Sequence, residues 1–284
     1  MAIGIGVNAW VWTAPITTDS VTGLVTKAAK MGFDVFEIPI EDPANFDAGR
    51  VKAALDESGL RPIVCGAYGP TRDLTHEDPR YRQECLDYVR AVLKLAEKWG
   101  AKVLPGPMYS AVGKHRQVSP EQKKIEWDLA VKGLQEAGRM AADHGVTLAL
   151  EPLNRFETDL INTCEQCVQL VKDVGLPSVG IHLDTFHMHI EEKSVYKAVK
   201  LAGKRLVHCH ACENDRGAPG SGQVHWKEWA KALKEVKYDG AVVIESFTPE
   251  CKSIAAAAAI WRPLAKSQDK LAKDGVTFLK KLLK

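Results

Sequence analysis

Eight short, β-rich apolar runs alternate with amphipathic helical stretches along the whole sequence. Between the runs, apolar residues recur at helical spacing, and several of the helical stretches end at a glycine, as α-helices often do. Regular alternation predicts a parallel sheet with right-handed crossovers, and eight units in 284 residues fit an α/β protein of the (β/α)8 barrel type. The expected strands are residues 3–10, 35–40, 61–67, 102–107, 147–152, 179–185, 206–211 and 241–246.

No composition break or linker divides the sequence, so residues 1–284 are expected to form one domain. The stretch from Leu264 to Leu283 has a helical pattern and predicts a C-terminal helical extension that closes the barrel. An open, doubly wound sheet is the alternative architecture. The glycine-rich phosphate turn that would favour it is missing, because Gly4-Ile-Gly6 lies inside the first strand and lacks the third glycine.

Composition argues against several classes of partner. A net charge of +2 gives no broad basic surface for nucleic acid, and no run of about 18 apolar residues predicts a membrane span. Seven scattered cysteines, an odd number, indicate reduced thiols in a cytoplasm. The C-x-x-C pairs Cys164/Cys167 and Cys209/Cys212 raise the alternative of a zinc or redox site. Their separation is far longer than in zinc ribbons, so a role as buried apolar side chains is expected.

Four consecutive strands in the second half end in a residue that commonly binds metals. The runs are Leu148-Ala-Leu-Glu151, Ile181-His-Leu-Asp184, Val207-His-Cys-His210 and Val242-Val-Ile-Glu245. Barrel active sites form at the C-terminal strand ends, so these four ligands are expected around one mouth. One histidine with three carboxylates favours Mn²⁺ or Mg²⁺, with Co²⁺ as a substitute, over zinc. The two glutamates would face each other across the ion, which suits proton transfer on a small chelated substrate.

Simpler interpretations exist for each of these residues. A single carboxylate at a strand end commonly caps the next helix or pairs with a cation. Four consecutive strands that end in this way favour a functional site. His208 lies one pleat deeper in the barrel, and His182 is placed similarly, so both are expected to support the ligands or to pack in the core.

Three longer segments of the second half carry distinctive motifs. They are Glu151-Pro-Leu-Asn-Arg-Phe-Glu157, Leu183-Asp-Thr-Phe-His-Met-His-Ile-Glu-Glu192, and His210 followed by Glu213-Asn-Asp-Arg216. These segments resemble the signature segments of ketose 3-epimerases, the D-tagatose, D-allulose and L-ribulose 3-epimerase family of xylose-isomerase-like barrels. The resemblance extends through all eight units to Ile260-Trp-Arg-Pro.

The resemblance implies roles for individual residues. It implies that Glu151, Asp184, His210 and Glu245 hold the metal, usually Mn²⁺, and that Glu151 and Glu245 are also the acid/base pair. The candidate sugar-binding residues fall into two groups, one implied by the resemblance and one expected from its position in the barrel. Those that match the family's residues for O1 and O2 are Glu157, His187 and Arg216. Candidates for contacts with the distal carbons, near the loops after the first four strands, are Trp12, Cys65, Tyr68, Met108 and Tyr109.

Each residue of the O1 and O2 group also has a structural alternative. Glu157 could support the following helix, His187 could be a polar residue at the rim, and Arg216 could form a loop salt bridge. The distal candidates could be ordinary packing residues.

Inversion at C3 of a ketose requires the removal of a weakly acidic proton next to the C2 carbonyl. A divalent ion on O2 and O3 would stabilise the enediolate, while one glutamate removes the proton and the other returns one to the opposite face. Few cationic residues besides Arg155 and Arg216 are expected near the mouth. A free ketohexose or ketopentose is therefore favoured over a sugar phosphate.

Other functions fit the same fold. An aldose–ketose isomerase or a hydroxypyruvate-type isomerase would move hydrogen between C1 and C2. A multi-zinc apurinic endonuclease would need more histidine ligands and a basic DNA groove. A non-catalytic sugar-binding barrel would not need two opposed glutamates. Because ketose 3-epimerases are commonly dimers or tetramers, the resemblance also implies a homodimer or homotetramer.

Overall fold

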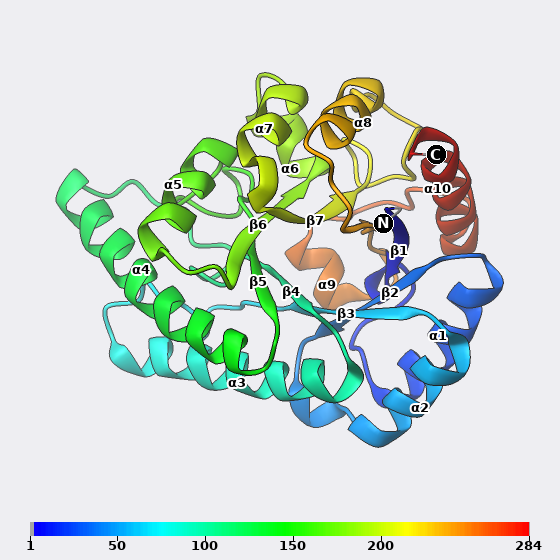
Figure 1. Cartoon of the computed structure of the whole chain (residues 1–284), viewed down its shortest axis with the longest axis horizontal. Coiled ribbons are helices and arrows are strands. Elements are labelled where there is room, and N and C mark those ends of the chain that lie inside the picture. The colour runs from blue at the N-terminus through cyan, green and yellow to red at the C-terminus, as the bar shows by residue number, and fades with distance from the viewer. Residues whose placement is uncertain (1–2, 284) are drawn as a thin grey trace.

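Eight parallel strands form the centre of the protein, and helices surround them (Figure 1). The computed structural model describes residues 3–283. The strands are β1 (Gly4–Asn8), β2 (Val35–Ile40), β3 (Arg61–Gly66), β4 (Val103–Gly106), β5 (Thr147–Leu150), β6 (Val179–Asp184), β7 (Leu206–Ala211) and β8 (Ala241–Ile244). The expected (β/α)8 barrel is confirmed, with each strand inside its expected range.

The helices between and after the strands form the outer layer. They are α1 (Thr18–Lys30), α2 (Ala48–Ser58), α3 (Pro79–Trp99), α4 (Pro120–Asp143), α5 (Cys164–Val174), α6 (Thr185–Glu191), α7 (Val195–Ala202), α8 (Trp226–Glu235), α9 (Lys252–Ala257) and α10 (Gln268–Leu283). Side-chain caps such as Thr17 and Thr163 begin several of them. Gly59 and Gly100 end α2 and α3 with a left-handed backbone that other residues rarely adopt.

Strand ends differ from the expectation for local reasons. β1 stops at Asn8 because its side-chain oxygen accepts a 2.9 Å hydrogen bond from the Trp10 backbone and caps a short 3-10 turn. β5 and β8 stop at Leu150 and Ile244, so the residue that follows each strand stands at the rim of the barrel.

The sheet is continuous except at one position. Its hydrogen-bonded order is β3-β2-β1-β8-β7-β6-β5-β4, and no ladder joins β3 to β4 within residues 3–283. At this seam the two backbones come close together: a Cβ atom on Gly106 would lie 3.2 Å from the Gly66 carbonyl oxygen. The ring of Tyr68 also packs over both glycines, 2.5 Å from a Cβ atom built on Gly66. Side-chain packing therefore closes the barrel where hydrogen bonds do not.

The barrel interior changes from apolar to polar along the strands. Near the strand beginnings lies a small buried cluster of Val35, Ile63, Ala241 and Val243. Further along, the inward positions carry polar side chains that are fully buried, among them Glu37 and the histidines of β6 and β7. A register shift at Ile181/His182 pairs His182 with His208 and Asp184 with His210.

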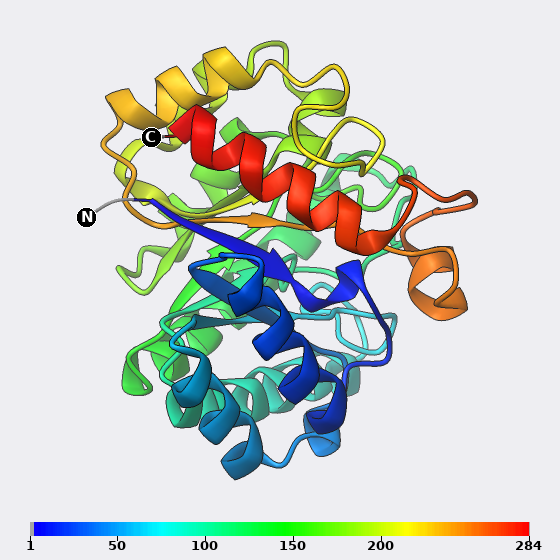
Figure 2. The same ribbon diagram turned by 90° about the vertical axis from the view of Figure 1, so that its right-hand side faces the viewer.

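Helix α10 is the C-terminal extension expected from the sequence. It begins at Gln268, four residues later than Leu264, and runs beside β1, while α9 lies beyond the C-terminal ends of the strands (Figure 2). A Cβ atom built on Gly275 would lie 2.6 Å from Ile244, so the helix packs closely on β8. None of the helices in the described part of the chain is both long and apolar enough to cross a bilayer.

Candidate active site

The four predicted metal ligands stand at the C-terminal ends of neighbouring strands. Glu151 and Glu245 directly follow β5 and β8, Asp184 ends β6, and His210 lies in β7. Each residue is no more than 6% exposed. Glu151, Asp184 and His210 each offer one ligand atom, and these atoms lie within 4.8 Å of one another. The structure thus brings three of the four predicted ligands into one compact group.

Glu245 joins this group through His210 and Arg216. Its Oε1 atom lies 3.3 Å from His210 Nδ1, and its Oε2 atom accepts a 2.8 Å hydrogen bond from Arg216 Nη1. The same Nη1 atom donates to Asp184 Oδ2 at 2.5 Å. Arg216 therefore offsets part of the negative charge of these two carboxylates.

The donor set fits a divalent cation that prefers oxygen. It consists of buried carboxylate oxygens and a single imidazole nitrogen. The Nδ1 atom of His210 is buried and has no hydrogen-bond partner among the described residues, whereas Nε2 lies 2.7 Å from Glu37 Oε1. A carboxylate on the far nitrogen is the usual partner of a metal-bound histidine, so the ring is oriented with Nδ1 toward the carboxylates.

Glu37 in β2 is a functional candidate that the sequence argument missed. It is fully buried, accepts a 2.7 Å hydrogen bond from Asn8 Nδ2, and lies 2.9 Å from His208 Nε2 as well as next to His210. Although burial opposes ionisation, His210 and His208 hold the pKa of Glu37 well below its ordinary value. The sequence does contain a feature that could have identified Glu37, because it is the one charged residue in the apolar run from Val35 to Ile40.

The predicted O1 and O2 group adjoins the metal group. His187 Nε2 lies 3.7 Å from Glu151 Oε1 and 3.2 Å from Arg216 Nη2. The Asn154 backbone N–H donates to His187 Nδ1 at 3.0 Å, so a neutral ring carries its proton on Nε2, facing the site. The Asn154 side chain also donates to Glu157 Oε1 at 2.7 Å. Asn154, which the sequence argument did not single out, therefore positions two predicted substrate residues.

Arg216 is held by both its backbone and its neighbours. Its φ of 67° is uncommon for a residue other than glycine, and the Ser246 hydroxyl donates to its carbonyl at 2.6 Å. The guanidinium carbon lies 4.0 Å from the ring centroid of Phe186 and 5.3 Å from that of Phe247. These aromatic rings keep the charged group in place inside a buried site.

The distal candidates are found in different surroundings. Cys65 is buried on the inward face of β3, where burial and the charges of Glu37 and Glu245 raise the pKa of its thiol well above the ordinary value. Met108 is fully buried after β4. The indole N–H of Trp12 donates to Asp269 of α10 at 2.8 Å, and within residues 3–283 no hydrogen bond or ion pair joins Trp12 to the carboxylate group.

The carboxylates at the mouth have different proton affinities. Burial raises the pKa of Glu151 well above its ordinary value, and the charges of Glu245 and Asp184 add to this effect. Burial also opposes ionisation of Asp184, but Arg216, His187 and His210 together outweigh it and lower its pKa to about 2. Burial lowers the pKa of His187, which favours the neutral ring. In the metal-free protein, the site therefore places Glu151, which readily keeps its proton, beside Asp184, which is ionised at neutral pH.

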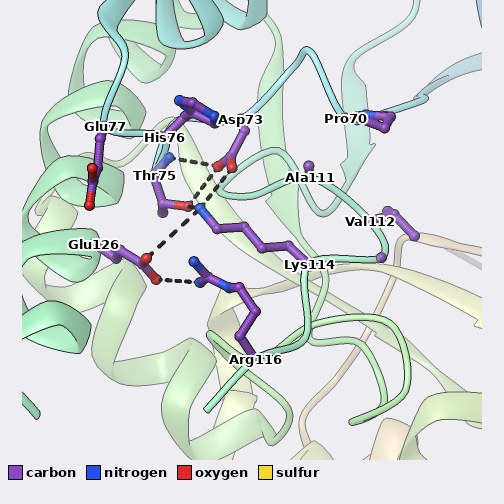
Figure 3. Close-up of a pocket in the computed structure, with 11 residues that line it drawn as sticks. Pro70, Asp73, Thr75, His76, Glu77, Ala111, Val112, Lys114, Arg116 and Glu126 are labelled. Carbon is purple, nitrogen blue, oxygen red and sulfur yellow. Dashed lines mark hydrogen bonds and ion pairs between the residues drawn. The ribbon is translucent and has the colours of Figure 1, made fainter. Parts of the chain in front are cut away.

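A pocket of about 390 Å³ opens between the loops after β3 and β4 and helix α4 (Figure 3). Its polar wall contains the ion pair between the partly buried Lys114 and the buried Asp73, at 2.8 Å, and Lys114 also donates to Thr75 at 2.7 Å. The adjacent Gly113 backbone donates to the Glu157 carbonyl at 2.7 Å. None of the predicted metal ligands lines this pocket. We therefore assign this network a role in supporting the loop that carries Glu157.

The cysteine pairs do not form a common site. The Cys164 thiol donates to the Ala198 carbonyl and the Cys167 thiol to the Leu150 carbonyl, so the two sulfur atoms face different strands and helices. All seven cysteines are free, and none belongs to a potential metal group in the described residues. Cys212 lies 3.6 Å from Asp184 Oδ1, on the inner side of the mouth.

Comparison with known proteins agrees with the geometry. The sequence-family model of the xylose isomerase-like TIM barrels matches residues 25–282 of this chain. The ketose 3-epimerase of Arthrobacter globiformis is 33% identical over 281 residues, which cover 97% of this chain and 95% of that protein. The L-ribulose 3-epimerase of Methylomonas sp. (strain DH-1) is 31% identical over 277 residues, which cover 97% and 96%.

Solved structures show the same likeness in three dimensions. The crystal structure of a D-allulose 3-epimerase from Methylomonas sp. in complex with D-allulose superposes with a TM-score of 0.93 at 30% identity, covering 99% of this chain and 97% of that one. Fold, site and sequence similarity lead to one conclusion. The chain belongs to the ketose 3-epimerases, isomerases built on the xylose isomerase-like TIM barrel.

Proposed function

We propose that this chain inverts C3 of free ketohexoses or ketopentoses with the help of a divalent cation. One observation carries the proposal: Glu151 and Glu245 follow β5 and β8, while Asp184 and His210 occupy the two strands between them. Two buried acid/base groups therefore flank one set of metal ligands. Proton transfer at a carbon beside a carbonyl needs such a pair of acid/base groups, whereas simple sugar binding does not.

Glu151, Asp184, His210 and Glu245 would hold the cation, and the oxygen-rich set favours Mn²⁺, with Mg²⁺ or Co²⁺ as substitutes. When bound, the cation would supply Lewis-acid polarisation of the ketose oxygens.

The protein's own groups would carry the proton. Glu245, which accepts a hydrogen bond from Arg216, would take the C3 proton on one face. Glu151, whose pKa is raised by burial, would deliver a proton to the other face, and exchanging these roles gives the reverse reaction.

Three residues would position the sugar. Arg216 and the Nε2–H of His187 can donate hydrogen bonds to O1 and O2, where negative charge develops. Glu157 would accept a hydrogen bond from a sugar hydroxyl, because Asn154 already orients its carboxylate. Such fixed donors and acceptors lower the entropic cost of reaching the reactive geometry.

The substrate is proposed to be an unphosphorylated ketose. A relative with 30% identity has been solved in complex with D-allulose, which is a free sugar. Arg155 lies near the mouth, but its guanidinium pairs with Glu191 at 2.9 Å and does not reach into the site as a phosphate-binding group would. Preferential turnover of ketose phosphates would contradict this part of the proposal.

The decisive experiment follows solvent deuterium during turnover. With Mn²⁺ and D-fructose, D-tagatose or L-ribulose in D₂O, we expect the C3 epimer with label at C3. Glu245→Gln should reduce the rate by at least about 10²-fold, the contribution of a general acid or base. Glu250→Gln, which changes an exposed carboxylate on the following loop, is the matched control and should keep the rate.

The position of the label separates the rival reactions. Label only at C1 or C2 would identify an aldose–ketose or hydroxypyruvate-type isomerase. No exchange on any ketose, from protein that still binds Mn²⁺, would indicate a non-catalytic sugar-binding barrel.

Two further properties belong to the proposal. Seven free cysteines support a reducing compartment, the cytoplasm. Family membership supports a homodimer or homotetramer, and the large exposed side chains of Phe156 and Trp261 are of the kind that an interface covers. Light scattering on the purified protein tests the oligomeric state, since a monomer would contradict it.

A further inference from the structure

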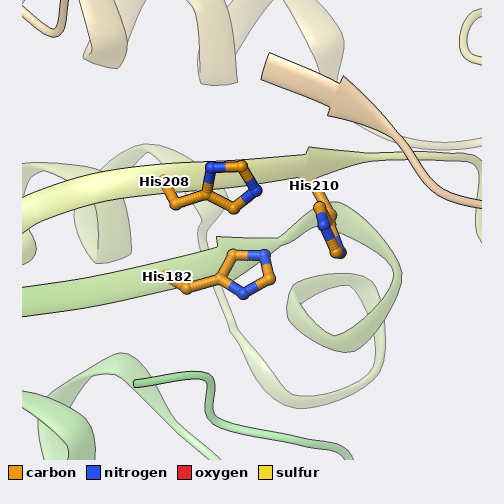
Figure 4. Close-up of side chains that lie close together, drawn as sticks. All are labelled: His182, His208 and His210. Atoms are coloured by element: carbon orange, nitrogen blue, oxygen red, sulfur yellow. The ribbon is translucent and has the colours of Figure 1, made fainter. Parts of the chain in front are cut away.

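Three histidines form a second group beneath the mouth of the barrel. His182 comes from β6, and His208 and His210 come from β7 (Figure 4). The register shift in β6 places His182 opposite His208. None of the three residues has measurable exposure. Only His210 also belongs to the oxygen-rich set at the mouth.

The nitrogen atoms of this group lack partners. Within the described residues, both ring nitrogens of His182, both of His208 and Nδ1 of His210 make no hydrogen bond, and neither does Glu37 Oε2. His208 Nε2 lies 2.9 Å from Glu37 Oε2, yet the pair lacks hydrogen-bond geometry. Buried polar atoms are costly when unpaired, so this concentration of them points to a ligand.

The geometry of the three rings suits a single metal ion. One nitrogen of each ring lies within 4.8 Å of the others. The ring centroids are 4.3, 4.8 and 5.1 Å apart, and the rings meet edge to face at 69–80° instead of stacking. With metal–nitrogen bonds of about 2.0 Å, three imidazoles around a tetrahedral ion have centroids roughly 5 Å apart.

We propose that His182, His208 and His210 form a nitrogen-rich site for a borderline divalent cation, with Zn²⁺ as the best match. Imidazole suits Zn²⁺ and Co²⁺, whereas the carboxylate set at the mouth suits Mn²⁺ and Mg²⁺. The unpartnered Glu37 Oε2, beside His208 Nε2, is placed to provide the fourth ligand. The barrel would then offer two different ligand sets, one above the other, that differ in metal preference.

The two sets are physically connected. His182 Nδ1 lies 3.5 Å from Glu151 Oε2, so the histidines directly adjoin the oxygen-rich set. His210 belongs to both potential ligand groups. A cation held by the histidines therefore engages a ligand of the upper set and alters its metal binding.

Cobalt titration of the metal-free protein tests the proposal without any measurement of turnover. Co²⁺ in a tetrahedral, nitrogen-rich site absorbs strongly in the visible range, whereas six-coordinate Co²⁺ among oxygen ligands absorbs weakly. We expect strong bands that saturate with one equivalent of Co²⁺ and that Zn²⁺ abolishes by displacement. Asp184→Asn, which weakens only the oxygen-rich set, should keep these bands.

His182→Leu is the decisive variant, because it removes one nitrogen ligand and leaves the four mouth residues unchanged. It should lose the strong bands and retain weakly absorbing Co²⁺. His182→Gln serves as a second, polar substitution, with circular dichroism confirming the fold of each variant. If the wild-type protein gives only weak bands, the histidines are hydrated and bind no metal, and the proposal is wrong. Strong bands that persist in both His182 variants would equally overturn the proposal.

Discussion

Glu37 illustrates how a fully buried residue beside a predicted metal ligand shapes the site. Its carboxylate lies 2.7 Å from His210 Nε2 and thereby turns Nδ1 of the same ring toward the other ligands. We expect Glu37→Gln to weaken Mn²⁺ binding about 10–100-fold, the usual effect of losing the partner of a metal-bound histidine. Isothermal titration calorimetry measures the change.

Glu41→Gln provides the matched control for this prediction. Glu41 follows the same strand, but its carboxylate binds Trp10 and the Ile16 backbone and does not contact a histidine. Its substitution should leave Mn²⁺ affinity unchanged. Equal losses in both variants would mean that the effect comes from general destabilisation of β2.

Asp184 makes the stability of the metal-free protein depend on pH. Its pKa is about 2 in the folded protein, because Arg216, His187 and His210 together outweigh the opposing effect of burial. In the unfolded chain it is about 4. Because the folded pKa is the lower one, the stabilisation is complete above about pH 4 and is lost as the pH falls toward 2.

Denaturant unfolding between pH 5 and 2 in the presence of a chelator tests whether stability falls as the pH falls. Wild type should lose stability more steeply than Asp184→Asn, which has no carboxylate to protonate. Parallel curves for the two proteins would show that Asp184 does not carry the effect.

Strand-end residues such as Glu151 and Asp184 could be located from sequence, because the alternation of strand side chains and the position of barrel sites are general rules. Glu37 and Asn154 were missed for a physical reason. Their roles arise from contacts with His210 and His187, which lie far away in the chain. The role of Trp12 stays a prediction: its place after the first strand suggests the mouth, and its indole N–H donates to Asp269, a partner that its place in the sequence does not indicate.

At the level of elements, the seam between β3 and β4 depends on glycine. We expect Gly66→Ala to destabilise the protein by about 1–3 kcal/mol, because its Cβ atom would lie 2.5 Å from the Tyr68 ring. Gly23→Ala in α1 is the control, since no atom lies within 4 Å of its Cβ position. This substitution should be neutral or should stabilise the protein by up to about 1 kcal/mol, the difference in helix propensity between glycine and alanine. Equal effects in chemical denaturation would refute the packing argument.

The loop that supports Glu157 depends on the ion pair between the partly buried Lys114 and the buried Asp73. Lys114→Met should cost about 3 kcal/mol, because Asp73 would stay buried without its cation. Lys124→Met removes an exposed pair of the same 2.8 Å length with Asp128 and should change the free energy of unfolding by less than about 1 kcal/mol. If the two variants unfold at the same denaturant concentration, the Lys114 network contributes no special stability.

The existence and order of the elements could be predicted, but the seam could not. Strands and helices are indicated by residues close together in sequence: apolar runs mark the strands, and glycines such as Gly59 and Gly100 mark the ends of helices. The missing β3–β4 ladder depends on how Tyr68 packs against Gly66 and Gly106, which only the folded chain brings together.

For the whole molecule, cation binding should raise thermal stability. An ion that binds only the folded protein stabilises it by about 2.7 kcal/mol at a concentration of 100 times Kd, which raises Tm by roughly 4–5 °C for a domain of this size. We expect Mn²⁺ to produce such a shift in wild type and chelation to reverse it. Asp184→Asn should reduce the shift strongly. An identical Mn²⁺ response in this variant would place the ion elsewhere.

The interrupted sheet has a consequence for how the chain could be rearranged. Because the ladder runs from β4 through β8 and β1 to β3, the first and last strands of the chain are neighbours inside the sheet, and its two free edges belong to strands that are consecutive in sequence. A circular permutant that starts at β4 and ends at β3, with a linker joining residues 283 and 3, would have the same order in its sequence as in its sheet. The permuted chain would have its ends where the hydrogen bonding between strands already stops.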